Sequence, residues 1–136
     1  MSSSPQATLA APGLALGRLL LAMLFLLEGW GKLRGYDAAS AYMDRFGVPS
    51  TLLPLVIAVE LGGGLMIAAG WHIKLAAVAL AVFCVLAGIL FHGNVSDRNQ
   101  LLHLEKDLAI AGGLLVLAVA GAGPWSWQWG AWRRGQ

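Results

Sequence analysis

The feature that most constrains this chain is an apolar run that would cross a membrane but acquires charge near its end. Within the stretch Leu26 to Arg34, a carboxylate at Glu28 is followed four residues later by the ammonium of Lys32. A helix places these two side chains on neighbouring turns of one face, with the acid N-terminal, which favours pairing. Arg18 falls within about 80° of both around the helix. A charged stripe of this kind cannot face lipid, so it predicts an interface with the rest of the protein.

Composition supports a membrane location and excludes other classes. Hydrophobic residues make up 58% of the 136 residues and charged residues only 12%, against about 25% charged in soluble domains. The net charge of +2 is scattered, without a basic run or interleaved aromatic residues, which excludes nucleic acid as a partner. Cys84 is the one cysteine, so the chain forms no internal disulfide and has no C-x-x-C pair.

The chain length accommodates about four spans of roughly 20 residues. We therefore expect an all-α membrane protein, a four-transmembrane-helix bundle within residues 13–124. The expected helices cover, approximately, residues 14–33, 51–70, 74–92 and 101–120.

The segments outside these helices are polar, small or aromatic. Residues 1–12 are rich in Ser, Pro and Ala and are expected to form a disordered lead. Residues 35–49 form either a short amphipathic helix lying in the interface or a plain connecting loop. The end of the chain, residues 125–136, has four tryptophans followed by two arginines, which is typical of an interfacial aromatic belt and headgroup anchor.

Glu60 is the most costly residue to insert in a membrane. It is the only charge of the second helix and lies near its middle, where an acid costs about 2.5 to 3.5 kcal/mol. It must therefore be paired, hydrated or protonated. Gly63 and Gly64 follow on the same side and leave bare backbone on which another helix can pack closely. Glu60 is therefore expected to point into a helix interface.

Four alternating spans bring the polar helix ends to one side of the membrane. Glu60 would lie about 13 Å below that surface, as the floor of one polar pocket. The predicted pocket residues are Glu28, Lys32, Glu60, His92, His103, Lys106 and Asp107.

Other interpretations of these residues remain open. Ionisable groups near helix ends often reach toward water, and Glu28 with Lys32 forms a pair that satisfies itself. Arg18 lies toward the opposite side, as a possible charge partner elsewhere. His92 and His103 lack a defined third ligand, so no metal site is predicted, and the sequence singles out no catalytic residue.

The order and spacing of these motifs resemble the DoxX family of small membrane proteins. The matching segments are Gly17-Arg18-Leu19-Leu20 through Lys32-Leu33, Val59-Glu60-Leu61-Gly62-Gly63 with Gly70, and Lys106, Gly112-Gly113 and Gly121-Ala122-Gly123-Pro124. Among the charged residues, Arg18, Lys32, Glu60 and Lys106 stand at positions of the family pattern. The Ser-Leu-Asp that commonly closes the family is here Trp125-Ser126-Trp127, a departure at the position of that acid.

The resemblance implies a four-helix fold in the bacterial inner membrane and a link to redox chemistry. The family takes its name from a subunit of an archaeal quinone-linked oxidoreductase acting on thiosulfate. The resemblance implies that this protein is an accessory subunit of a quinone-linked redox or oxidative-stress assembly. Quinone is then the candidate cofactor. The candidate partners are the lipid bilayer and subunits of the redox complex.

Two other functions are open on the sequence alone. A small-solute or proton-coupled transporter or channel would use the same polar pocket, and four helices would then need a homo-oligomer to form a path. A membrane scaffold that recruits partner proteins would use the buried charges only to hold helices together. Basic residues in the loops are evenly divided between the two sides, and the arginines after the tryptophans favour cytoplasmic termini.

Overall fold

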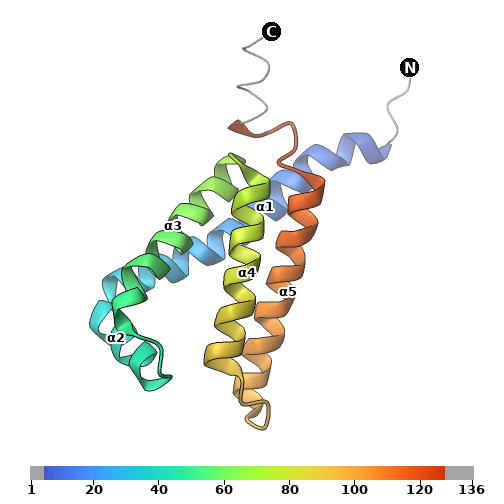
Figure 1. The fold of residues 1–136 in the computed structure, drawn as a ribbon. Coiled ribbons are helices and arrows are strands. Elements are labelled where there is room, and N and C mark those ends of the chain that lie inside the picture. The colour runs from blue at the N-terminus through green and yellow to red at the C-terminus, as the bar shows by residue number, and fades with distance from the viewer. Residues whose placement is uncertain (1–4, 128–136) are drawn as a thin grey trace.

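The computed structural model describes residues 5–127, and most of this part of the chain is helical. Figure 1 shows the elements in order, and no strand occurs in this part of the chain. The elements are α1 (Pro5–Arg34), α2 (Tyr36–Arg45), the short 3-10 helix η1 (Ser50–Leu52), α3 (Leu53–Ala69), α4 (Ile73–His92) and α5 (Arg98–Ala120). The prediction of an all-α membrane protein is confirmed.

The long helices form two pairs. α1 packs along α3, with α2 and η1 in the connection between them, and α4 packs along α5. Contacts between α3 and α4 join the two pairs. In Figure 1 the pairs converge where α1 begins and α5 ends, and they diverge toward α2 and the turn between α4 and α5.

Three described segments are long and apolar enough to cross a membrane: Leu9–Arg34, Ser50–Ala69 and Ile73–His92. The fourth expected span corresponds to α5, which has 23 residues. Its first half carries Glu105, Lys106 and Asp107 in succession, and it is not among the three apolar segments. The structure therefore supports three of the four expected spans by length and composition.

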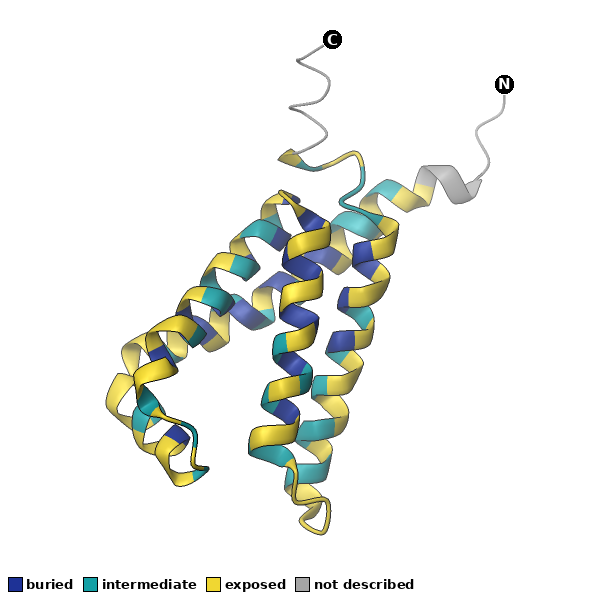
Figure 2. Cartoon of the chain, in the orientation of Figure 1, coloured by how far each residue is buried: buried dark blue, intermediate teal, exposed yellow. Residues whose placement is uncertain are grey.

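The core is an inward stripe of apolar side chains, and the outer faces are apolar too. Phe25, Ile67, Leu80 and Leu114, one from each long helix, are at most 3% exposed. Figure 2 shows this buried stripe facing the interior of the bundle, with exposed residues on the outside. Many exposed side chains are large and apolar, which is the pattern of a bundle surrounded by lipid rather than water.

Helix ends follow local chemistry. α5 begins at Arg98, three residues before the expected start, because the Asp97 side chain accepts hydrogen bonds from the backbone N–H groups of Asn99 (2.8 Å) and Gln100 (3.2 Å). This is an N-cap, which satisfies N–H groups that have no partner inside a helix. α3 ends at Ala69, and the C-cap residue Gly70 has a left-handed φ of 69°, which suits glycine at the end of a helix.

The structure describes most of the N-terminal segment but only the first residues of the Trp-rich C-terminal segment. α1 already begins at Pro5 and continues through Pro12, so residues 5–12 are helical where the sequence predicts a disordered lead. The alanines of this segment favour helix strongly, which offsets the backbone hydrogen bond lost at Pro12. Of the Trp-rich tail, Trp125 and Trp127 are exposed, and residues 128–136 lie outside the described residues.

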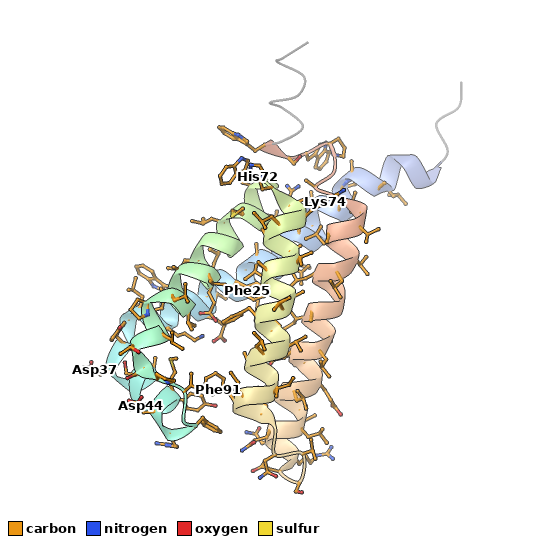
Figure 3. The ribbon with its side chains drawn as sticks, viewed as in Figure 1. Phe25, Asp37, Asp44, His72, Lys74 and Phe91 are labelled. Carbon is orange, nitrogen blue, oxygen red and sulfur yellow. The ribbon has the colours of Figure 1, made fainter. Side chains whose placement is uncertain are left out.

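The connection between α1 and α3 contains the short helix that was one of two possibilities. The rings of Tyr42 in α2 and of Phe46, which caps its end, lie 4.9 Å apart between centroids in a tilted arrangement. Both rings also contact Phe91 near the end of α4, at 5.5 and 5.6 Å. These aromatic contacts connect α2 to the second helix pair at the diverging end of the bundle, where Figure 3 labels Phe91.

Candidate functional site

The centre of the candidate site is an ion pair between α1 and α3. The Lys32 Nζ atom lies 2.9 Å from Glu60 Oε1 and 3.3 Å from Glu28 Oε2. The Glu60 side chain is only 5% exposed, whereas that of Glu28 is 58% exposed. Lys32 therefore connects one acid at the surface with one acid in the interior.

Gly29 makes this pairing possible. A Cβ atom at this position would lie 2.9 Å from Leu61 Cγ and 3.1 Å from Glu60 Cβ. Since apolar carbons ordinarily approach to about 3.5 to 4.0 Å, only glycine lets α1 pass this close to α3. The side chain of Lys32, three residues later on α1, then reaches Glu60.

Glu60 is only half satisfied by this pair. Its Oε2 atom is buried and has no hydrogen-bond partner among the described residues. Buried polar atoms in folded proteins are almost always hydrogen-bonded, because leaving one unpaired costs about 1 to 3 kcal/mol or more. The carboxylate therefore has capacity to accept one further hydrogen bond from a donor that enters the bundle.

A second polar group lies between α4 and α5. The rings of His92 and His103 stack at 4.9 Å between centroids with an interplanar angle of 22°. The Lys106 Nζ atom lies 3.5 Å from His103 Nδ1. Asp107 packs against Gly88, where a Cβ atom would lie 3.4 Å from Asp107 Oδ2.

The structure places the seven predicted pocket residues in two groups, one on each helix pair, whereas the sequence predicts a single pocket. No ion pair joins the groups within residues 5–127. Both groups lie in the half of the bundle where the pairs diverge.

Cys84 is a further inward residue of α4 that was not among the predicted pocket residues. It is 5% exposed and belongs to the buried core. Its spacing of four residues from Gly88 and eight from His92 was the available signal. Each long helix thereby contributes an inward polar residue to this half of the bundle: Lys32, Glu60, Cys84 and Asp107.

Arg18 lies at the opposite end of the bundle and contacts backbone carbonyls rather than a carboxylate. Although only 4% exposed, it donates hydrogen bonds to the carbonyl oxygens of Ala122 and of Trp125, the latter at 2.6 Å. It therefore connects α1 to the segment that follows α5. Over residues 5–127, no group of three or more His, Cys, Asp or Glu side chains is placed to hold a metal ion.

The family model named DoxX matches residues 13–93, a segment that contains Arg18, the Lys32–Glu60 pair and Cys84. The chain belongs to the DoxX family. No solved structure matches it.

DoxX relatives extend over most of the chain. It is 42% identical over 114 residues to the inner membrane protein YqjF of Escherichia coli, covering 84% of this chain and 88% of the relative. It is 27% identical to the inner membrane protein YphA of the same organism, over 81% of this chain and 84% of the relative. It is 26% identical to a Bacillus subtilis protein named "Putative oxidoreductase CatD", over 74% and 79%. This DoxX chain is accordingly an integral protein of the bacterial inner membrane.

Proposed function

We propose that this DoxX protein is the membrane-embedded, quinone-binding subunit of a redox assembly, with Glu60 and Lys32 as the contacts of the quinone headgroup. The observation that carries the proposal is the unpartnered, buried Oε2 atom of Glu60 beside the ammonium of Lys32. The name of the Bacillus subtilis relative, which contains the word oxidoreductase, agrees with this class of function.

The residues present suit a quinone headgroup chemically. A quinone offers carbonyl oxygens that accept hydrogen bonds, and its reduced form offers hydroxyls that donate them. Lys32 is a donor without acceptor capacity, and the free oxygen of Glu60 is an acceptor. When bound, a quinone supplies two-electron, two-proton exchange with the membrane pool, so the partner subunits would supply or remove the electrons.

Lys32 has a role in holding the charge of Glu60. With Lys32 Nζ at 2.9 Å, the carboxylate stays compensated inside a low-dielectric bundle, where an isolated charge would be costly. Glu28 gives the same ammonium a second partner at 3.3 Å. Lys32 can thus move part of its contact to Glu28 while Glu60 accepts a proton at Oε2.

An apolar groove of about 430 Å³ lies between α3 and α4. Val59, which precedes Glu60, and Gly63 contribute to its α3 wall, and the α4 side includes Leu80. The groove opens on the lipid-facing side, since Ala58 and Gly62 in its wall are exposed. We assign it to the isoprenoid tail of the quinone, because apolar walls that open toward lipid suit a hydrocarbon chain.

We also assign α5 as the fourth membrane span. Its 23 residues extend about 35 Å at 1.5 Å per residue, enough for a hydrocarbon core of about 30 Å. His103 and Asp107 are partly buried and face α4. Inward-facing ionisable residues of this kind are how membrane helices carry charge.

Co-purification of quinone tests the headgroup contacts. The wild type, Glu60→Gln and Glu105→Gln are purified in mild detergent, and the extracted lipids are analysed by mass spectrometry. Glu105 is an exposed acid on α5, so the same substitution there is a matched control. We expect quinone with the wild type and Glu105→Gln and its loss with Glu60→Gln. Equal quinone in all three, or none in folded wild type supplied with excess quinone, would contradict the proposal.

The groove is tested separately with two exposed glycines. A Cβ atom at Gly62, in the groove, or at Gly112, on α5, would meet no atom within 4 Å. Gly62→Leu fills the groove and Gly112→Leu does not, with the same change in helix propensity. We expect Gly62→Leu alone to weaken binding of a ubiquinone with its full tail, and neither to affect its tail-free analogue. If both variants bind the long-tailed quinone like wild type, the tail lies elsewhere.

A further inference from the structure

A second hollow lies at the opposite end of the bundle, where Arg18 holds the segment after α5. Its volume is about 710 Å³, and its walls come from the first turn of α4 and from residues 120–124 with Ser126. His72 and Lys74 are its basic residues, and Figure 3 labels both at this end. None of the contacts that define the Lys32–Glu60 site involves these residues.

The charge at this end is entirely positive. All seven acidic residues of the chain lie in the other half of the bundle or at its middle. Glu60, the nearest along its own helix, is separated from Gly70 by about 15 Å at the rise of a helix. Lys74 is exposed and has no acidic partner among the described residues. The charge of the hollow therefore favours an anion.

The backbone adds to this complementarity. α4 begins at Ile73, and its N-cap residue His72 makes no side-chain capping hydrogen bond. The first N–H groups of a helix have no partner inside it, and they carry the positive end of the helix dipole. Both features favour an anion at this helix end, as does the charge of Lys74, the second residue of the 20-residue helix.

Tryptophans place the hollow at the level of lipid headgroups. Trp71, Trp125 and Trp127 are 48 to 64% exposed and lie next to the hollow's residues in sequence. Exposed tryptophans of membrane proteins concentrate at the membrane–water interface. The remaining walls include apolar residues, among them Ile73, Leu75 and Pro124, which suit the first carbons of acyl chains better than a free ion.

We propose that this hollow binds the phosphate headgroup of an anionic phospholipid, with Lys74 as the charged contact and His72 as a further hydrogen-bond donor. The site is independent of the quinone proposal, because it lies at the other end of the bundle. Phosphatidylglycerol is the probe, with phosphatidylcholine as the lipid that carries the same phosphate without net charge.

Native mass spectrometry of the full chain in detergent measures the preference for phosphatidylglycerol over phosphatidylcholine. We expect Lys74→Gln to lower this preference about fivefold, the factor for one basic residue near an anionic surface. Ala120→Phe, at an exposed wall position, fills the hollow without changing charge and should lower it as well. Arg98→Gln removes an exposed basic residue at the other end and should leave the preference unchanged.

The remaining outcomes overturn the proposal in different ways. An equal loss with Arg98→Gln would mean diffuse attraction of anionic lipid to any basic residue. A loss with Lys74→Gln but none with Ala120→Phe would mean that charge matters and the hollow does not. An unchanged preference in Lys74→Gln would remove Lys74 from the site. Thermal unfolding in phosphatidylcholine alone checks that all variants are folded.

Discussion

The substitution Gly29→Ala tests the close contact that positions the candidate site. A methyl group at Gly29 would lie 2.9 Å from both Cγ and Cδ2 of Leu61 and 3.1 Å from Glu60 Cβ, inside the ordinary contact distance of about 3.5 to 4.0 Å. Leu61 can rotate away, but Glu60 Cβ is attached directly to the α3 backbone. The contact is therefore relieved only when α1 and α3 move apart.

The magnitude follows from two opposing effects. Overpacking of this kind costs about 1 to 3 kcal/mol, while alanine favours helix over glycine by about 0.8 to 1 kcal/mol. Gly31→Ala, two residues later, has the same effect on propensity, and a Cβ atom there would meet nothing within 4 Å. The difference in the free energy of unfolding between the two variants therefore isolates the overpacking, with Gly31→Ala more stable by about 1 to 3 kcal/mol.

Equilibrium unfolding in mixed micelles with increasing SDS, followed by tryptophan fluorescence, measures this difference. Gly29→Ala is also expected to retain less quinone than Gly31→Ala, because separating the helices lengthens the contact between Lys32 and Glu60. If the two variants unfold within about 0.5 kcal/mol of each other, the usual range for surface substitutions, then the helix contact at Gly29 does not hold the pair together.

Three further predictions concern other contacts. Lys32→Met should destabilise the protein by about 3 to 5 kcal/mol because it leaves buried Glu60 uncompensated. Adding Glu60→Gln should recover part of that loss in the same unfolding assay. Arg18→Lys keeps the charge but loses the planar fork of donors, so hydrogen exchange should become faster in residues 121–126. Phe91→Ala should speed hydrogen exchange in α2, since each aromatic pair contributes about 0.5 to 1.5 kcal/mol.

Each of these variants has a control on the same helix. Glu28→Gln removes the exposed partner of Lys32 and should cost less than about 1 kcal/mol; a loss as large as that of Lys32→Met would mean that burial of Glu60 is not the cause. Arg34→Lys is an exposed arginine replacement on α1, and Leu90→Ala truncates an exposed side chain next to Phe91. If these controls change hydrogen exchange as much as their partners, the named contacts are not responsible.

The helices themselves could be predicted because apolar length and glycine spacing are local properties. α3 ends at Ala69 and α4 begins at Ile73, each within a few residues of the boundary predicted from hydropathy. Residues 5–12 could not be assigned in this way, because their Ser, Pro and Ala content is compatible with either a loop or a helix. α5 shows the limit of hydropathy, since charged residues such as the exposed Glu105 and Lys106 lie in its first half, and it is not among the helices apolar enough to cross a membrane.

The grouping of the site residues depends on tertiary packing that hydropathy does not report. The cost of a charge in the membrane and the glycines on the same side of the helix predicted that Glu60 points into a helix interface, and the structure shows it 4% exposed there. The sequence did not predict that Lys32 lies closer to Glu60 than to Glu28, since these distances depend on how closely α1 crosses α3. Similarly, the stacking of His92 on His103 depends on the turn between α4 and α5, whose Asp97 cap sets where α5 begins.

The same glycine contacts that allow close packing also determine where charge can be buried. Gly29 brings α1 to α3 beside Glu60, and Gly88 brings α4 to α5 beside Asp107. In both cases an acid lies beside a glycine that contacts the neighbouring helix, so the carboxylate packs against protein. Moving α1 away from α3 would expose the charge of Glu60 to the hydrocarbon region, where it costs several kcal/mol. Packing and site formation are therefore one equilibrium, which is why variants of Gly29 should alter stability and quinone retention together.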